Sequence, residues 1–475
     1  MDAFARALAQ EARATGAGFA LLFFSQGLVD AAALAAALRA HAPALAHAGC
    51  STAGEITPQG LEDGHVLAML FPSATFTVAS AMVEGISASG MDRVTAEVEA
   101  LRRALRASGG GDPGGSVFAL CLIDGLSYAE EAVTSAIHWG LDDIPLIGGS
   151  AGDDLKFETT RLIRNGRVAS DSAVIVLVAT AVPFHVFKTD NFVPTGEKLV
   201  VTASDPEHRV VREFNAEVAA QEYAASVGMA PETLTPMSFA SHPVVVKVGG
   251  EYYCRSIQKM NPDGSLSFFC AIDDGVVLSI AQPMGMVEST RAALKEVDAR
   301  LGGIDMILGF DCVLRRLDAR NRQVFRDISE LYRANRVIGF GTYGEQYRSM
   351  HLNQPFTGIA YDLSLEGWLA EELSFRDGIQ TGPMRGYDRT GRMVEEEYQM
   401  GGVSHGPRRA WHANGRLAEE ERYEFGVLLE GRYWDENGTL VRSFTLDPAD
   451  PGWETVRRHR RIMAGERLAD DREQS

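Results

Sequence analysis

The chain of 475 residues carries a formal net charge of −19 and five cysteines, with no C-x-x-C pair among them. Because basic faces supply most of the affinity for nucleic acids and anionic membranes, this excess of acid argues against both kinds of partner. The scattered cysteines indicate a reducing compartment and argue against a disulfide framework or a zinc site.

Length and hydropathy predict a cytoplasmic protein of about three domains. The longest apolar run, Ala173–Phe184, is shorter than the ~20 residues that span a bilayer, so no transmembrane segment is expected. Residues Met1–Leu22 also lack the layout of a signal peptide.

The first predicted unit is a strand, a helix, a short second strand and a glycine-rich motif. An apolar strand at Phe19–Phe24 precedes a helix over Asp30–His41. The motif Gly49–Glu55 ends the unit, about thirty residues after the first strand, which is the size of a βαβ unit.

A hairpin and a helix are predicted next. Val66–Leu70 and Thr75–Ala79 predict two strands that pair around Pro72, and Asp92–Leu105 has apolar residues at helical spacing. The glycine-rich run Ser108–Ser116 predicts an exposed loop.

The second predicted unit repeats the first. A strand at Phe118–Ile123 is followed by Ser127 and Glu130, which form the pattern of a capping box at the start of a helix. The motif Gly148–Asp153 ends this unit, again about thirty residues after its first strand.

A stretch of strands then leads to the third unit. Asn165 and Gly166 predict a type I′ hairpin turn, and Glu213–Val227 predicts a helix that crosses to the next lobe. The further predicted strands are Val174–Val178, Val186–Lys188, Leu199–Thr202, Val244–Val248, Tyr252–Ile257, Leu266–Cys270 and Val276–Ile280.

The third predicted unit has its strand at Met306–Phe310, a helix over Asn321–Ala334 and the motif Gly339–Glu345. The threefold use of one motif indicates either a shared ligand site or a shared structural corner.

The C-terminal part of the chain has a different repeat. Gly391, Gly415 and Gly438 recur about two dozen residues apart between aromatic and acid-rich strands, and the pairs Asn414-Gly415 and Asn437-Gly438 predict type I′ turns. The pattern predicts a small curved sheet of stacked hairpins, followed from Asp447 by a charged tail that is either a frayed helix or disordered.

The predicted fold class is therefore α/β (α+β), with two lobes of mixed β-sheet and a small antiparallel sheet of hairpins. The predicted boundaries are 1–212 and 213–375 for the lobes, 380–446 for the hairpin repeats and 447–475 for the tail.

The motifs suggest a binding site for a small zwitterion. Glycine turns allow close approach and present N–H groups to an anion, while hydroxyls and acids at strand ends could receive an ammonium group. Arg255 could hold a ligand carboxylate, although a surface ion pair is an equal alternative. The predicted ligand-binding residues are Ser51, Thr52, Gly54, Glu55, Asp124, Gly149, Ser150, Gly152, Asp153, Arg255, Thr342 and Glu345.

These residues resemble a known family. The segments Gly49–Glu55 and Ile147–Asp154 resemble the hallmarks of the N-terminal FIST domain, while Arg255–Ile257, Phe310–Arg315 and Ile338–Glu345 resemble its FIST C-terminal partner. Residues 382–441 are similar to MORN-type repeats.

The resemblance implies a bacterial sensory domain that binds a small molecule such as an amino acid and signals to a separate partner protein. It also implies an alternative, a haem-binding nitric oxide sensor that regulates a histidine kinase or cyclase. The candidate axial ligands are His185, His208, His242 and His351. A protein-interaction scaffold built on the C-terminal repeats is a further alternative.

No enzyme and no resident metal are predicted. Ser51 and Ser150 lie in glycine turns, but the G-x-S-x-G pattern of a nucleophile elbow is absent. Cys50 and Cys312 are interpreted as small core residues.

Overall fold

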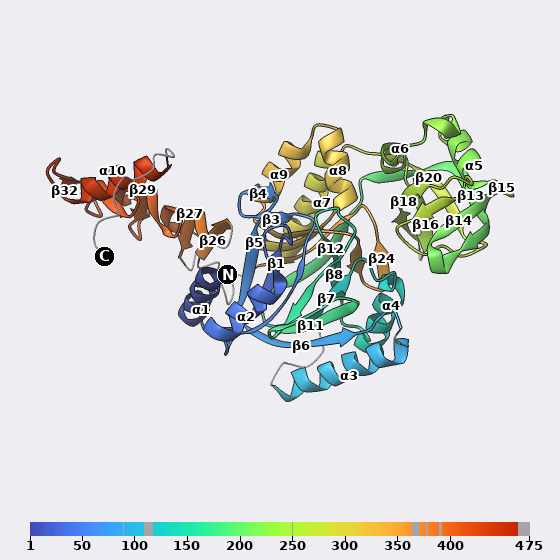
Figure 1. Ribbon diagram of the computed structural model, residues 1–475, viewed down its shortest axis with the longest axis horizontal. Helices are drawn as coiled ribbons and strands as arrows, with labels where there is room; N and C mark the ends of the chain where they lie inside the picture. The colour runs from blue at the N-terminus through green and yellow to red at the C-terminus, as the bar shows by residue number, and fades with distance from the viewer. Residues whose placement is uncertain are drawn as a thin grey trace, which may run out of the picture. The chain divides into compact units, whose positions relative to one another are not determined.

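The computed structural model describes residues 1–88, 90–108, 117–248, 250–362, 371–376, 379–388 and 392–463. The chain divides into two compact units, Met1–Glu366 and Gly367–Ser475. The predicted fold class is confirmed, since mixed sheets with helices are followed by an antiparallel hairpin sheet (Figure 1). Among the described helices, none is long and apolar enough to cross a membrane.

Three sheets of the first unit are built alike, each around two parallel strands joined by helix. The pairs are β1 (Ala17–Phe24) with β2 (Ala46–Ser51), β7 (Val117–Asp124) with β8 (Leu146–Ala151), and β21 (Met306–Cys312) with β22 (Val337–Thr342). Their connections are α2 (Ala31–His41), α4 (Glu130–Leu141), and α8 (Val313–Asn321) with α9 (Phe325–Ala334). An antiparallel strand lies beside the first strand of each pair: β5 (Val66–Pro72), β11 (Ser172–Thr180) and β25 (Phe356–Tyr361).

The motif of each repeat leads into a short hairpin that joins the sheet of another repeat. The hairpin β3 (Glu55–Thr57) and β4 (Gly60–Glu62) joins β22, β23 (Glu345–Tyr347) and β24 (Met350–Leu352) joins β8, and β9 (Leu162–Arg164) and β10 (Arg167–Ala169) joins β2. The exchange is cyclic: the first repeat completes the third, the third completes the second, and the second completes the first. The three repeats therefore form a closed ring with pseudo-threefold symmetry.

The hairpin predicted around Pro72 is wrong, because its two strands lie in different sheets. Strand β5 pairs with β1, whereas β6 (Phe76–Glu84) pairs along its whole length with β11. All nine residues of β11 are buried, so it gives β6 a partner inside a large sheet. A two-stranded ribbon would be marginal by comparison. Strand β12 (Phe184–Thr189) likewise leaves the second repeat and pairs with β25.

A shared core lies where the three sheets meet. It contains Phe23, Phe310 and Phe340, one from each of β1, β21 and β22, and the Phe23 and Phe340 rings stack with centroids 4.6 Å apart. Helices cover the outer faces (Figure 1): α1 (Asp2–Thr15) and α2 lie on the first sheet, α3 (Met91–Ala107) and α4 on the second, and α7 (Met286–Leu301) with α8 and α9 on the third.

A small antiparallel β-domain, residues 192–283, is inserted between the second and third repeats. Its strands are β13 (Phe192–Asp205), β14 (Val210–Phe214), β15 (Glu217–Val218), β16 (Val244–Val248), β17 (Glu251–Arg255), β18 (Ile257–Met260), β19 (Leu266–Phe268) and β20 (Val277–Pro283), with α5 (Ala219–Ser226) and α6 (Pro236–Ser241). The predicted helix over Glu213–Val227 is wrong in its first part. Val211 and Phe214 are buried in the sheet, and Asn215 and Ala216 turn the chain with φ of 54° and 65° before α5 begins.

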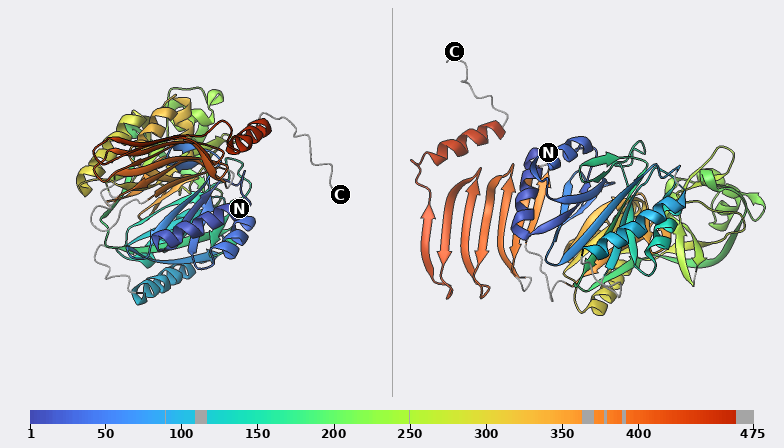
Figure 2. Two further views of the ribbon diagram at one scale, coloured as in Figure 1. Left: turned by 90° about the vertical axis from the view of Figure 1, so that its left-hand side faces the viewer. Right: turned by 90° about the horizontal axis from the view of Figure 1, so that it is seen from below.

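The second unit is a meander of antiparallel strands, which confirms the predicted hairpin sheet (Figure 2). The strands are β26 (Glu371–Arg376), β27 (Ile379–Tyr387), β28 (Met393–Met400), β29 (Val403–Trp411), β30 (Leu417–Glu424), β31 (Val427–Trp434) and β32 (Leu440–Thr445). The tail forms α10 (Gly452–Met463), which packs Trp453 and Val456 against Leu429 and Leu446.

The type I′ prediction holds at one turn and fails at two. Asn165 and Gly166 both have positive φ, 47° and 78°, as this turn requires. In the C-terminal sheet Gly415 and Gly438 have positive φ but Asn414 and Asn437 do not. Bulges at Trp411 and Trp434 lengthen these loops, and Asn414 Oδ1 accepts from Arg416 N within its turn. The predicted loop at Ser108–Ser116 lies, apart from Ser108, outside the described residues, and so does Gly391.

Candidate functional site

The three motifs meet at one corner of the ring. Backbone hydrogen bonds join them cyclically: Ala53 N donates to Gly341 O (2.8 Å), Gly152 N to Ser51 O (3.1 Å) and Tyr343 N to Ser150 O (3.1 Å). In each motif a Cβ on the first glycine would lie within about 2.1 Å of a carbonyl oxygen on the neighbouring parallel strand. These glycines, Gly49, Gly148 and Gly339, are therefore required by close strand packing.

Most of the predicted motif residues are used to build this corner. Ser51 Oγ donates to Gly152 O (2.7 Å) and accepts from Arg161 N (3.0 Å). Thr52 Oγ1 donates to Glu55, whose other oxygen accepts from His65 N (3.0 Å). Burial raises the pKa of the Glu55 carboxyl to about 7.

The predicted glycine ligands also face protein atoms. A Cβ on Gly54 would lie 2.1 Å from Arg316 Nη1, one on Gly149 2.5 Å from Thr342 Cγ2, and one on Gly152 2.9 Å from Ala53. Backbone at these three positions packs against other repeats, which leaves no face open to a ligand there.

Asp153 and Asp124 hold the loop that follows the second motif. Asp153 is 1% exposed and accepts from the N–H groups of Phe157, Glu158 and Thr159 at 2.7 to 2.9 Å, and from the Tyr343 hydroxyl. Asp124 accepts from Leu126 N, Thr160 Oγ1 and Asp171 N. Both carboxylates are occupied by the protein itself.

Glu345 differs from its counterpart Glu55. Thr342 Oγ1 donates to one oxygen of Glu345, as Thr52 does in the first motif, but Glu345 Oε2 is buried without a hydrogen-bond partner among the described residues. Complete burial raises the pKa of this carboxyl well above its usual value.

The pseudo-threefold register shows one place where the third repeat departs from the other two. Opposite the first motif glycines lie Ile163 (opposite Gly49), Ile56 (opposite Gly339) and Gln346 (opposite Gly148). Their partners across the exchanged hairpins are Val168, Leu61 and His351. Two repeats therefore place an apolar pair at this position, and the third places a polar pair, Gln346 and His351, that is no more than 3% exposed.

Gln346 and His351 continue a polar chain that begins at Ser150. Gln346 Nε2 donates to Ser150 Oγ (2.9 Å) and lies 3.1 Å from His351 Nδ1. Since Nδ1 receives this amide hydrogen, the neutral imidazole carries its own hydrogen on Nε2. Burial, together with Arg209 and Arg255, lowers the pKa of His351 to about 4, so the ring is neutral at pH 7. His351 Nε2 is buried and has no partner among the described residues.

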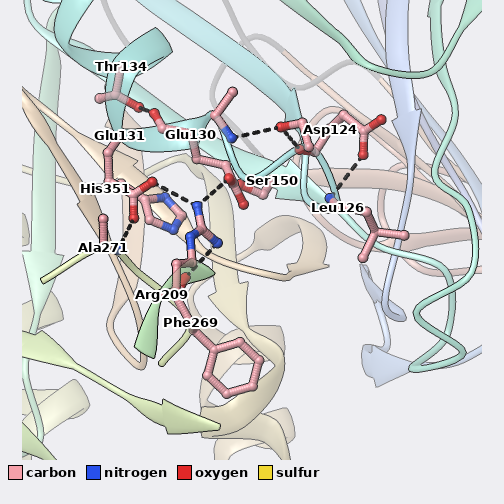
Figure 3. Close-up of polar contacts among 12 residues, drawn as sticks. Asp124, Leu126, Glu130, Glu131, Thr134, Ser150, Arg209, Phe269, Ala271 and His351 are labelled. Atoms are coloured by element: carbon pink, nitrogen blue, oxygen red, sulfur yellow. Dashed lines mark hydrogen bonds and ion pairs between the residues drawn. The ribbon is translucent and has the colours of Figure 1, made fainter. Parts of the chain in front are cut away.

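A buried ion cluster flanks His351 (Figure 3). Arg209 donates to Glu130 (2.6 Å), Glu131 (2.7 Å) and Phe269 O (2.9 Å). Glu131 also accepts from Ala271 N (2.9 Å). The cluster ties the N-terminus of α4 to the small β-domain.

The predicted capping box at Ser127 and Glu130 is wrong, because Glu130 belongs to this ion cluster. The Glu130 carboxylate pairs with Arg209, while Ser127 Oγ donates to Asp124 O, and the N-cap residue Ala129 makes no side-chain cap. A buried guanidinium attracts a carboxylate more strongly than the amide at a helix end.

Sequence reasoning missed Gln346, Glu131 and Arg209, and weighed His351 as a haem ligand alone. Comparison of the repeats could have revealed this site from sequence, since Gln346 and His351 of the third hairpin stand where the first hairpin has Ile56 and Leu61. Of the predicted residues, Ser150 belongs to the polar chain and Arg255 Nη1 donates to the His351 carbonyl oxygen (2.9 Å). We call Ser150, Gln346, His351 and Arg255 the His351 site.

The chemistry of this site is that of hydrogen-bond recognition. Leaving a buried donor such as His351 Nε2–H unpaired costs about 1–3 kcal/mol, which an acceptor on a ligand would recover. The described residues contain no group of His, Cys, Asp or Glu that could hold a metal ion. All five cysteines are buried and free, and burial raises the pKa of the Cys50 and Cys312 thiols, so neither is a reactive thiolate.

Comparisons with known proteins place two domains in the chain. Residues 18–217 match the family model of the FIST N domain and residues 219–348 match that of the FIST C domain. A comparison with curated proteins finds no match. Similar solved structures include one of cyanuric acid hydrolase, 12% identical, covering 75% of this chain and 94% of that chain with a TM-score of 0.30. A second, cyanuric acid hydrolase from A. caulinodans, is 11% identical and covers 75% and 93% with a TM-score of 0.32. Likeness at this level supports no functional argument.

Proposed function

Because the chain carries FIST N and FIST C domains, which are sensory domains that bind small ligands in signalling proteins, we propose that it senses a small molecule at the His351 site. One observation carries this proposal. A buried polar pair, Gln346 and His351, stands where the two sister repeats have apolar residues, and its outer donor has no partner among the described residues. Departures from an otherwise consistent packing pattern are expected at functional sites.

The location of the site also suits signalling to a partner protein. Ser150 lies at the end of β8 and His351 on β24, and Arg209 and Ala271 bring the small β-domain against the same cluster. A ligand that contacts His351 would therefore affect the contact between the repeats and the small β-domain. In this proposal the readout is a cytoplasmic partner that recognises this arrangement, and the C-terminal hairpin repeats, if of the MORN type, provide a further protein contact.

Binding without catalysis is the simplest use of these groups. Ser51 Oγ is occupied by backbone groups, and Ser150 Oγ receives the Gln346 amide and has no base beside it among the described residues.

Of the four histidines predicted as candidate haem ligands, His351 is the buried one, and it does not fit a haem. A porphyrin bound at His351 Nε2 would need a wide opening beside a ring that is 3% exposed and packed against Gly344. His208 is exposed and paired with Asp205, and His185 and His242 are half-buried. We therefore propose no haem.

A thermal-shift screen of the full chain against the twenty amino acids, small carboxylic acids and their neutral amides tests the proposal. A ligand at a hundred times its Kd adds about 2.7 kcal/mol to stability, so binding is visible as a raised Tm. We expect one chemical class to stabilise the wild type and the response to be reduced in Ser150→Ala.

The matched control is Ser226→Ala, whose hydroxyl donates only within α5, to Glu222 O. This variant should keep the full response. A Ser150→Ala protein that also keeps it, or silence of the wild type across the whole panel, would reject the His351 site as the sensor.

A further inference from the structure

We propose that the His351 site binds the carboxylate group of its ligand, with Arg255 and His351 as the two donors. This inference rests on the proposed function, and it adds the ligand's charge and chemical class.

Arg255 is an arginine without an acidic partner. It lies at the end of β17, half-buried, and Nη1 donates to two carbonyl oxygens, those of His351 (2.9 Å) and Cys254 (3.5 Å). No carboxylate lies within ion-pair distance of it in the described part of the chain. This is unusual in a protein with a net charge of −19. The nearby Arg209, by contrast, is neutralised by Glu130 and Glu131.

The two donors proposed for the ligand belong to Arg255 and His351, which contact each other. Arg255 bonds the backbone of His351, and His351 presents the unpaired Nε2–H of its neutral ring. A guanidinium and an N–H group call for an anion with two acceptor atoms, since each hydrogen bond to a charged group contributes about 1.5–3 kcal/mol.

The charge balance selects a carboxylate over a phosphate. One uncompensated guanidinium beside a neutral imidazole offsets a single negative charge, whereas a phosphate near pH 7 brings a larger charge that these two donors would leave partly unpaired. Arg209 and Arg255 disfavour a cation beside His351 and lower the pKa of its ring, while Glu131 acts on this pKa in the opposite direction.

This ligand differs from the zwitterion expected from the motifs, because a zwitterion would also need a carboxylate of the protein to receive its ammonium group. Glu131 is the acid nearest to His351 in Figure 3, and both of its oxygens are already used by Arg209 and Ala271 N. Glu55 and Asp153 are likewise occupied. The site therefore has no free carboxylate for an ammonium group among the residues that we assign to it, and a carboxylic acid without an amino group should bind as well as an amino acid.

Pairs of acids and amides with the same carbon skeleton test the inference. Propionate and propionamide, alanine and alaninamide, and benzoate and benzamide are titrated into the full chain by calorimetry. We expect the tightest-binding acid to lose at least tenfold in affinity when converted to its amide. Arg255→Gln should also weaken this acid at least tenfold, and Arg255→Lys should give an intermediate affinity because it keeps the charge.

The control is Arg291→Gln, which removes an exposed arginine of α7 and should leave the affinity unchanged. If Arg255→Gln does not fold, Arg255→Lys decides, since wild-type affinity in it would overturn the role of the guanidinium. This inference would be overturned if amides bound as tightly as acids. The proposed function would still stand in that case if replacing Gln346 and His351 abolished binding. If no compound binds the wild type, the proposed function fails and this inference fails with it.

Discussion

His351 and Gln346 are polar residues at a position that the two sister repeats fill with apolar side chains. Ile56 and Leu61 show that apolar side chains fill the equivalent position, so packing does not require an amide and an imidazole there. Burying these groups costs desolvation that a partly satisfied network does not recover. Under the proposed function, a ligand supplies the missing partner.

The lowered pKa of His351 predicts a pH dependence of stability. The pKa is about 4 in the folded protein, against 6.5 for a free histidine. Below pH 6.5 the unfolded chain takes up a proton that the folded chain does not, so stability is present above pH 6.5 and is lost as pH falls toward 4. The full difference corresponds to roughly 3 kcal/mol.

Urea unfolding at pH 6.5, 5.5 and 4.5 measures this contribution. A variant with Gln346→Ile and His351→Leu should lose less stability on acidification than the wild type. Glu131, Arg209 and Arg255, the ionisable groups around the ring, are the same in both proteins. Equal slopes in the two proteins would contradict the assignment of a neutral His351.

The predicted site residues were partly recoverable from sequence. Ser150 lies at the end of a parallel strand, as predicted, and the role of Arg255 as a carboxylate ligand stays a prediction, since its guanidinium donates to carbonyl oxygens in this structure. Asp153 and Glu55 were expected to face a ligand but bond to their own loops. Residue type alone cannot distinguish these cases, because the N–H groups that hold a ligand carboxylate also hold an internal one.

At the scale of elements, the loop from Asp153 to Thr160 is an insertion in the second repeat. In the first and third repeats the motif acid, Glu55 or Glu345, is itself the first paired residue of the hairpin. In the second repeat the insertion places Asp154, Leu155 and Phe157 at φ of 55° to 64°, a conformation that costs non-glycine residues about 1 kcal/mol or more each. Asp153 and the stacking of Phe157 on Tyr343, at 4.7 Å, hold this loop in place.

Asp153→Ala should therefore destabilise the folded protein. Removing this carboxylate leaves three backbone N–H groups and the Tyr343 hydroxyl without their acceptor, and we expect a loss of about 2–4 kcal/mol. Denaturant midpoints measure the loss, with Asp143→Ala, an exposed acid after α4, as the control that should change little. A loss below about 0.5 kcal/mol, the usual range for a surface substitution, would show that Asp153 is free to serve a ligand.

Strand and helix identities were predictable where the signal is local. Phe19–Phe24 and Phe118–Ile123 were identified from continuous apolar runs, and Asp30–His41 from helical spacing. The pairing of β6 with β11 was not, because the choice between a hairpin and a distant strand depends on contacts nearly a hundred residues away. Pattern reasoning resolves elements better than their partners.

At the scale of the molecule, the hairpin exchange makes the three repeats interdependent. Strand β3 of the first repeat pairs with β22, and β8 of the second pairs with β23, so both sheets need residues beyond the FIST N match. The shared phenylalanine core includes Phe310 and Phe340 from the third repeat. The boundary at which a family model ends is thus not a folding boundary in this chain.

Fragments of the chain test this interdependence. Residues 1–217 should not fold alone, because β3 would lose its partner β22, β8 its partner β23 and β12 its partner β25. Residues 1–366, which form one compact unit, should fold and unfold in a single transition. Circular dichroism melts of both fragments measure this. A cooperative melt of residues 1–217 would contradict the prediction, because it would show that these residues fold without the third repeat.

The central claim is that Gln346 and His351 are polar for function and not for stability. The most direct measurement compares the wild type with the double variant Gln346→Ile and His351→Leu, which copies the first repeat's Ile56 and Leu61 into the third. Replacing a buried polar pair by apolar residues of suitable shape is often neutral or stabilising. We predict an unfolding free energy at pH 7 within about 1 kcal/mol of the wild type or above it, with the ligand-induced rise in Tm abolished. A variant that loses several kcal/mol of stability, or that still responds to the ligand as the wild type does, would contradict the account.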